Sequence, residues 1–380
     1  MFQTLFVYSF LLGAMFILNE FSRLSKKCSF NAKCNINTPI FAILIFALVF
    51  GIRYHVGVDH EAYISAYEHF RISGNFGDED IGYAFLTRIF AEQDLHYSYF
   101  FFFVAFLQLF LVMYALRENS KVHGFVIILF FLSSTFLQFM NLIRQELGFA
   151  LFAIAIYFLS KRSFIKTYAA LIIACTFHIS AIILLPIPFL YIKKSNYFSN
   201  VKLQLVVFFL FFVISIILKP AEYLFTLIPI ELFEMFGYEG YYNMVAYGDT
   251  KWLVSEKEAG FGFYITNLIC LCNILFSSKV KSYFNSKFLN IIYDLYFIGI
   301  LYRFLVSGSL ILSRINYYFF TFGFIVSSFT LYFLLRKSAS KKSKYIGIGL
   351  IILYVLMFYA VIVKSGIANN AIYRTIFDVV

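Results

Sequence analysis

The amino-acid sequence predicts an all-α protein whose helices cross a membrane many times. Of its 380 residues, 62% are hydrophobic and only 13% are charged. Soluble domains are about half apolar and about a quarter charged, so a water-soluble protein is excluded. Eleven apolar stretches support the same class, because about 17–25 residues suffice to cross a bilayer. These stretches cover residues 2–19, 39–52, 99–116, 123–141, 144–160, 164–192, 203–218, 261–277, 288–306, 315–335 and 345–363.

Charge divides the linkers between these stretches into two groups. Six linkers together carry 20 Lys/Arg residues and only two acids, whereas the long linkers 53–98 and 219–260 carry 15 of the 20 acids. The positive-inside rule therefore places the six basic linkers in the cytoplasm and the two acidic loops outside. The basic linkers are residues 20–38, 117–121, 161–166, 193–202, 278–287 and 336–344. No cationic region precedes residues 2–18, so we expect a retained span there and both chain ends outside.

The stretch 164–192 requires a different course, because basic residues flank it on both sides. If it crossed once, every later linker would change sides and the basic segment 336–344 would face outward. We therefore predict a re-entrant hairpin that breaks near residues 178–180. Each arm of about 13 residues would rise about 20 Å, which is short of the hydrocarbon core of about 30 Å. A single long tilted span is the alternative. The expected fold is one integral membrane domain, residues 1–380, with about ten full spans and this hairpin.

Four arginines lie at or inside the apolar segments, namely Arg53, Arg144, Arg303 and Arg314. A guanidinium does not escape burial by losing its proton, and at mid-bilayer it costs about 2.5–3.5 kcal/mol on insertion scales. Its planar fork binds phosphate bidentately. Several arginines at one level therefore predict a phosphorylated, lipid-linked substrate. For Arg303, snorkelling of the side chain to the membrane interface is the alternative.

Two polar motifs accompany the first two arginines. Residues 53–63 open the acidic loop and contain Asp59 and Tyr63, although a hydrated loop explains them as well. Residues 141–146 lie between two apolar runs, where helical spacing places Asn141 and Gln145 on one face. A polar turn between helices is the other interpretation of this motif.

Three further features belong to the predicted outer side. His178 lies at the expected hairpin apex, where an imidazole suits proton transfer near neutral pH, although a structural role is the other reading. Arg314 precedes Asn316 and two tyrosines at the start of a later span. The loop 219–260 mixes aromatic and acidic residues, which fits either a sugar-binding lining or an interfacial aromatic belt.

In this order, four motifs between about residues 40 and 335 resemble the EpsG family of bacterial polysaccharide polymerases, a Wzy-type group. They are Arg53…Val56-Gly57…Asp59…Tyr63, Asn141…Arg144-Gln145, Phe177-His178…Ser180-Ala181, and Arg314 before a Tyr-rich span. One departure is His60, which replaces the aromatic residue expected after the aspartate.

The resemblance implies a multi-pass protein of the bacterial cytoplasmic (inner) membrane, with a helical bundle similar to GT-C-like glycosyltransferases. Such proteins join oligosaccharide repeat units, carried on undecaprenyl diphosphate, into O-antigen, capsule or exopolysaccharide at the outer face. The lipid-linked oligosaccharide and the bilayer are the implied partners, with chain-length regulator and flippase proteins as further candidates. No nucleic acid and no cofactor are expected.

The residues themselves fit glycosyl transfer with a diphosphate leaving group. Positive charge stabilises the departing anion, and we expect Arg144 and Arg314, with Arg53, to supply it. A general base must accept the proton of the attacking hydroxyl, and His178 and Asp59 are both candidates. The remaining expected substrate contacts come from Asn141, Gln145, Arg303 and Tyr63. No Asp-rich metal motif accompanies these arginines, so we expect a metal-independent reaction.

Three rival functions remain open at this point. An O-antigen ligase-like transferase would differ in its acceptor rather than in its chemistry. A membrane O-acyltransferase would need its polar site nearer the cytoplasm. A flippase or transporter would need a continuous charged path across the membrane, yet the inner halves of the spans are almost free of charge, with Asp294 the main exception.

Overall fold

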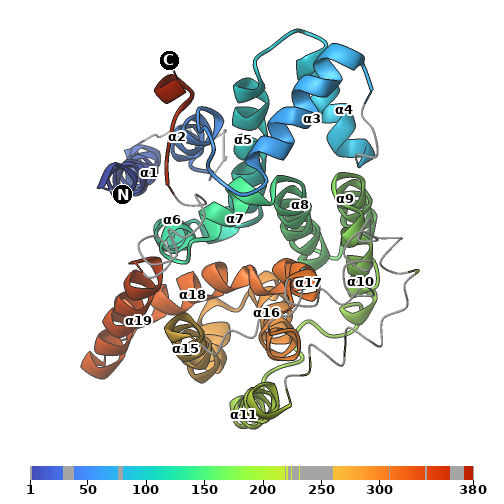
Figure 1. Ribbon diagram of the computed structural model, residues 1–380. Helices are drawn as coiled ribbons and strands as arrows, with labels where there is room; N and C mark the ends of the chain where they lie inside the picture. Colours follow the sequence, from blue (N-terminus) through green and yellow to red (C-terminus); the bar gives the residue numbers. More distant parts are fainter. Residues whose placement is uncertain are drawn as a thin grey trace. The chain divides into compact units, whose positions relative to one another are not determined.

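Helices build almost the whole of the computed structural model. The described residues are 2–28, 38–75, 80–218, 220, 224, 231, 260–307, 309–338, 340–359 and 372–379. Among them there is one isolated β-bridge and no strand, as Figure 1 shows. The predicted all-α class is confirmed. Most of the loop 219–260, including its expected sugar-binding lining, lies outside the described residues.

The chain divides into two compact units, residues 1–188 with 351–380 and residues 189–350. The helices of unit 1 are α1 (Phe2–Cys28), α2 (Ile40–Gly51), α3 (His60–Ser73), α4 (Ile81–Ala91), α5 (Tyr97–Ala115), η1 (Arg117–Val122), α6 (His123–Leu132), α7 (Thr135–Asn141), α8 (Ile143–Ser160), α9 (Phe164–Phe177), η2 (Ile179–Leu184) and η6 (Ile376–Val379). Unit 2 contains α11 (Val201–Ile217), α15 (Phe261–Phe284), α16 (Lys287–Leu305), α17 (Leu310–Phe320), α18 (Phe322–Tyr332) and η4 (Phe333–Lys337). The unit boundaries fall within α10 (Ile187–Leu190) and α19 (Lys341–Tyr359).

Seven helices in the described residues are long and apolar enough to cross a membrane. They are α1, α5, α8, α15, α16, the run Leu312–Lys337 and α19. The bent pair α6–α7 makes an eighth span if both parts are counted together. The other two expected spans are α2 and α11, which have 12 and 17 residues. At 1.5 Å per residue, α2 rises only about 18 Å, so it is too short to cross unaided.

A helix break occurs at the residue where the hairpin was expected to turn. Helix α9 ends at Phe177, and His178 is extended, with φ −159° and ψ 115°. The second arm consists of the 3₁₀ helix η2 and the short α10 rather than one α-helix. Pro186 precedes α10 and Pro188 lies within it, and neither can donate a backbone hydrogen bond. The two arms pack against each other, and the predicted break is confirmed.

The expected straight span over residues 123–141 is instead bent by 67° between α6 and α7. Ser134 adopts a left-handed conformation with φ 60°, which no regular helix accommodates. Ser133 and Thr135 share a side-chain hydrogen bond of 2.7 Å across the bend. The sequence contains no glycine or proline at this point, so turn chemistry does not reveal the bend.

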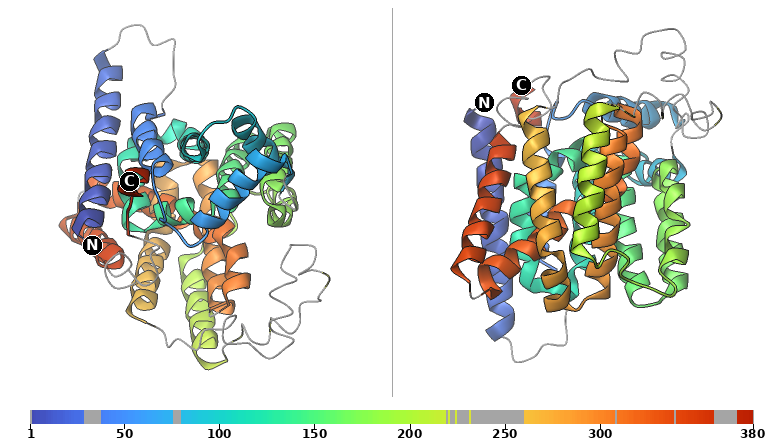
Figure 2. Two further views of the ribbon diagram at one scale, coloured as in Figure 1. Left: turned by 45° about the horizontal axis from the view of Figure 1, so that its top comes forward. Right: turned by 90° about the horizontal axis from the view of Figure 1, so that it is seen from below.

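The acidic loop 53–98 is folded rather than open. It contains the helices α3 and α4, which pack against each other and lie side by side in Figure 1. In unit 1 the two chain ends also meet, as both panels of Figure 2 show. Tyr373 donates its backbone N–H to Thr4 Oγ1 at 3.1 Å. The C-terminal segment then pairs with the start of the acidic loop, since Tyr54 N–H donates to Arg374 O at 2.9 Å.

Contacts within each unit agree with the predicted sides of the linkers. In unit 1, Lys161 donates to Glu118 at 2.7 Å, which joins two basic linkers. In unit 2, Lys281 donates to Asn196 Oδ1 at 2.8 Å, which joins two others.

Candidate functional site

Arg53 lies at the end of α2 and is completely buried. Its guanidinium donates to the carbonyl oxygens of Phe50 at 2.9 Å, Met140 at 2.8 Å and Val56 at 3.3 Å. The guanidinium carbon also lies 3.6 Å from the centroid of the Phe50 ring. These contacts tie α2, α7 and the first motif together. Arg53 thus has the surroundings of a framework residue, and its role as a diphosphate ligand stays a prediction.

The first and second sequence motifs meet at Asn141. Its Oδ1 accepts a hydrogen bond of 3.1 Å from the backbone N–H of Asp59. Gly57 has φ +104°, and a Cβ added there would lie 2.9 Å from the same Oδ1. The glycine is therefore required both by its backbone conformation and by the close approach of Asn141. Asp59 itself is half-buried at the N-cap position of α3.

His60, the residue that departs from the expected aromatic, is buried and packs as an aromatic ring. Its centroid lies 5.3 Å from that of Phe101, and its Nδ1 accepts from the backbone N–H of His55 at 3.2 Å. Burial, and then the electrostatic effects of Arg53 and His55, lower the pKa of His60 to about 3. The ring is therefore neutral around pH 7.

Tyrosines connect the first motif to Arg144. The rings of Tyr63 and Tyr83 are both buried, with their centroids 6.0 Å apart. The Arg144 guanidinium carbon lies 5.7 Å from the Tyr83 centroid. Tyr83 belongs to α4, so this helix brings an aromatic surface to the start of α8.

The side chains of Arg144 and His178 both reach Asp80, a residue of the acidic loop. Arg144 NH1 lies 3.4 Å from Asp80 Oδ2, and His178 Nδ1 lies 3.5 Å from the same oxygen. Asp80 Oδ1 accepts a hydrogen bond of 3.2 Å from the backbone N–H of Ile179. Asp80 and His178 are each 15% exposed, and Arg144 is 31% exposed. We call these three residues the Asp80 cluster.

The three residues of the Asp80 cluster come from the first turn of α8, the N-terminus of α4 and the break after α9. It places the predicted hairpin apex on the same side of unit 1 as the acidic loop. The sequence did not reveal Asp80, because it ends the acidic run Asp78-Glu79-Asp80, which resembles a solvated loop. Its position directly before an apolar helix, where aspartate favours the N-cap, was the available signal.

Gln145 and Glu146 follow Arg144 on α8, and both are buried. The start of this helix is held by Gln108 of α5, whose side-chain amide donates to Ile143 O at 2.9 Å. Helix α8 begins after Leu142, where φ −96° and ψ 55° interrupt the chain between α7 and α8. The break separates Asn141, at the end of α7, from Arg144 and Gln145.

Arg303 and Arg314 belong to unit 2. Arg303, on α16, donates to Asn267 Oδ1 at 3.0 Å, and its guanidinium lies 5.1 Å from the Phe263 centroid. Arg314 is half-buried on α17, a helix whose first turn is capped by Ser309 through a 3.3 Å bond from Leu312 N–H. Their predicted convergence with Arg144 on one diphosphate stays a prediction.

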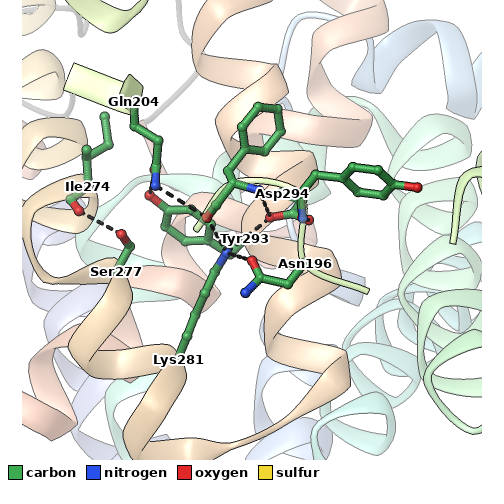
Figure 3. A network of polar contacts seen from close by, with 9 residues as sticks. Asn196, Gln204, Ile274, Ser277, Lys281, Tyr293 and Asp294 are labelled. Carbon is green, nitrogen blue, oxygen red and sulfur yellow. Dashed lines mark hydrogen bonds and ion pairs between the residues drawn. The ribbon is translucent and has the colours of Figure 1, made fainter. Parts of the chain in front are cut away.

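Unit 2 contains a second polar group, which Figure 3 shows from close by. Lys281 Nζ donates to Asn196 Oδ1 at 2.8 Å, to Phe198 O at 2.9 Å and to Asp294 Oδ1 at 3.1 Å. Asp294 Oδ2 accepts from the backbone N–H of Tyr197 at 2.6 Å. Asp294 has no exposed surface and Lys281 is 7% exposed. We call this arrangement the Lys281–Asp294 pair.

Comparisons with other proteins complete the description of the site. Among the described residues, no group of three His, Cys, Asp or Glu side chains is arranged to hold a metal ion. The searches of curated proteins and of solved structures return no match to the chain. The model of the EpsG family matches residues 36–375, a range that includes the Asp80 cluster, all of unit 2, most of unit 1 and every motif described above. The protein therefore belongs to the EpsG family, whose members are Wzy-like polymerases.

Proposed function

We propose that this protein joins oligosaccharide units, carried on undecaprenyl diphosphate, at the outer face of the bacterial cytoplasmic membrane. Membership of the EpsG family supports a polysaccharide polymerase of the membrane. The observation that carries the finer proposal is the Asp80 cluster. It brings a partly exposed guanidinium and an imidazole to one carboxylate, on the side of the acidic loop.

The proposed reaction is a direct displacement at C1 of the donor sugar. A hydroxyl oxygen at the non-reducing end of a fresh unit forms the new bond to C1. The bond from C1 to the diphosphate oxygen breaks, and undecaprenyl diphosphate leaves with that electron pair. The hydroxyl proton passes to His178 Nε2. Attack opposite the diphosphate inverts C1.

Arg144 is the proposed ligand of the departing diphosphate. Its guanidinium is partly exposed and lies at the start of a helix, where the positive end of the helix dipole adds to the attraction for an anion. Positive charge placed where the leaving group becomes negative lowers the barrier to departure. Arg314 and Arg303 stay candidates for a second contact with the diphosphate or the lipid.

His178 is the proposed base because it shares Asp80 with Arg144. Asp59 is the alternative, since its backbone N–H binds Asn141 at the start of α3 and so joins the first two motifs. Tyr63 and Gln145 are proposed to shape the walls of the acceptor site.

An O-antigen ligase would use the same chemistry with another acceptor, so the phenotype of the deleted gene must separate the two. Loss of a polymerase leaves single-unit surface glycan, whereas loss of a ligase or flippase leaves none.

Polymer formation in proteoliposomes, with purified lipid-linked repeat units, tests the residue assignments. Removing one preorganised donor of charge costs about 100- to 1,000-fold in kcat, and we expect that loss for Arg144→Ala. We expect a loss of roughly 100- to 10,000-fold for His178→Ala, which is the range that general-base catalysis contributes. Asp59→Asn should retain polymer if His178 is the base.

Arg88→Ala is the matched control, because Arg88 lies on α4 but pairs with Glu92 on its exposed face. This variant should polymerise normally. Chains of normal length from both Arg144→Ala and His178→Ala would contradict the assignment. Loss in Asp59→Asn alone would transfer the role of the base to Asp59.

A further inference from the structure

One carboxylate oxygen of Asp80 lies near both Arg144 and His178, the two residues proposed to act in the reaction. Its Oδ2 lies 3.4 Å from Arg144 NH1 and 3.5 Å from His178 Nδ1. Both distances lie at the outer limit of a hydrogen bond, for which 2.7–3.2 Å is usual. Its Oδ1 is engaged separately by the Ile179 N–H at 3.2 Å. Asp80 Oδ2 therefore lies between Arg144 and His178 and makes a short hydrogen bond to neither of them.

Asp80 lies at the break after α9, and helix α4 approaches α9 closely beside it. A Cβ added at Gly82 would lie 2.4 Å from Thr176 Oγ1 and 2.9 Å from Thr176 O. No side chain larger than hydrogen fits between α4 and α9 at this point. Since Ile179 N–H also binds the carboxylate, Asp80 and His178 keep a fixed relation. Arg144 has the most exposed side chain of the three, so it is the one that a ligand arriving from solvent can reach.

From this geometry we propose that Asp80 is a positioning residue that couples binding of the donor diphosphate to preparation of His178. The inference rests on the proposed function. A diphosphate offers the guanidinium several charged oxygens in bidentate geometry, which form a stronger contact than the 3.4 Å contact to Asp80. When Arg144 turns to the diphosphate, Asp80 Oδ2 is left to His178 alone.

The consequence for His178 is a defined tautomer. A carboxylate that accepts from Nδ1–H holds the proton on that nitrogen and leaves Nε2 as the acceptor. Nε2 is then ready to take the proton of the acceptor hydroxyl. The base is thus prepared only after the donor has bound, so the acceptor hydroxyl is not activated at a site without donor.

Ring ¹⁵N spectra of labelled histidine test this coupling without a catalytic readout. The protein is reconstituted in lipid, and the His178 signals are assigned by their loss in His178→Ala. Undecaprenyl diphosphate, which carries no sugar, is the probe. In the wild type, we expect it to shift the His178 ring toward the Nδ1–H tautomer. In Asp80→Asn, the probe should leave the tautomer unchanged.

Kinetics provide the second arm of the test. A structural defect lowers the amount of folded protein or raises the donor KM, whereas a positioning defect lowers kcat. We expect Asp80→Asn to reduce kcat by about 100-fold, the low end of general-base effects, with a donor KM that is unchanged or lower. Asp94→Asn is the matched control, because Asp94 is an exposed carboxylate of the same loop that pairs with Arg71. It should change neither parameter.

The outcomes separate the inference from the proposed function. Normal polymer from Arg144→Ala and His178→Ala would overturn the proposed function. If those two variants lose activity, the inference is overturned by full kcat in Asp80→Asn, or by a His178 tautomer that does not respond to the probe in the wild type. It is also overturned if Asp80→Asn responds to the probe as the wild type does.

Discussion

The Lys281–Asp294 pair and the Asp80 cluster both join a cation to an aspartate, but they differ in how completely the charges are used. Lys281 makes three hydrogen bonds of 2.8–3.1 Å, and Asp294 is wholly buried. In the Asp80 cluster, Arg144 and His178 lie 3.4 and 3.5 Å from one oxygen, and Arg144 is 31% exposed. The charges of the pair are buried, whereas the cation of the cluster is partly exposed.

This difference is the one expected between a structural ion pair and the proposed site. A buried ion pair holds together only when its remaining donors and acceptors are also satisfied, as those of Lys281 are. The pair ties the linker that holds Asn196 to α15 and α16 of unit 2. The long contacts from Arg144 and His178 to Asp80 add little stability, which is consistent with the proposed role in binding a ligand.

The largest expected effect on stability follows from breaking the pair. Lys281→Met leaves the buried Asp294 carboxylate without its cation, and such a change costs about 3–5 kcal/mol. Unfolding followed in detergent micelles measures this loss. Lys281→Met combined with Asp294→Asn should recover most of it, because asparagine still accepts from the Tyr197 N–H. Arg144→Ala should change stability by less than about 1 kcal/mol. An equal loss in the two single variants would remove the distinction between the regions.

Sequence patterns predicted those parts of the fold that depend on hydropathy and charge. The break at His178 followed from the basic residues on both sides of residues 164–192, and the helix ends there. The bend at Ser134 was not predicted, because a left-handed serine leaves no mark in composition. The helices α3 and α4 were missed because the loop was judged by its acids rather than by its apolar faces.

The candidate site was predicted in its motifs but not in its centre. Asp59 and Asn141, and likewise Arg144 and His178, came from separate motifs that the fold brings together in two groups. Asp80 was missed because its contacts join residues 64 and 99 positions apart. One sequence contains no signal that pairs such positions. Arg53 shows the reverse problem, since an arginine beside a span looks functional until its carbonyl partners are seen.

An intermediate effect is expected at Gly57, which lies against Asn141 of the second motif. Gly57→Ala combines a left-handed backbone with a contact of 2.9 Å to Asn141 Oδ1, and we expect a cost of about 1–3 kcal/mol. Gly74→Ala is the matched control, because Gly74 also has positive φ but nothing within 4 Å of an added Cβ. Unfolding in detergent should show the larger loss for Gly57→Ala, together with reduced polymer. Equal losses would show that Asn141 moves aside.

The smallest expected effect is on the pH dependence of stability, and it concerns His60. This buried imidazole belongs to neither the Asp80 cluster nor the Lys281–Asp294 pair. Its folded pKa is about 3, whereas an unfolded histidine titrates near 6.5. Between these values the unfolded state binds more protons, so the stability contributed by neutral His60 is full above about pH 6.5 and falls as the pH is lowered toward 3. His60→Phe keeps the packing on Phe101 and should remove about one proton from this slope. Unfolding midpoints between pH 4 and 7, with His69→Phe in the same loop as a control, measure the change. A slope that His60→Phe leaves intact would show that the ring is already charged in the folded protein, and the framework beside Arg53 would then have to hold two cations.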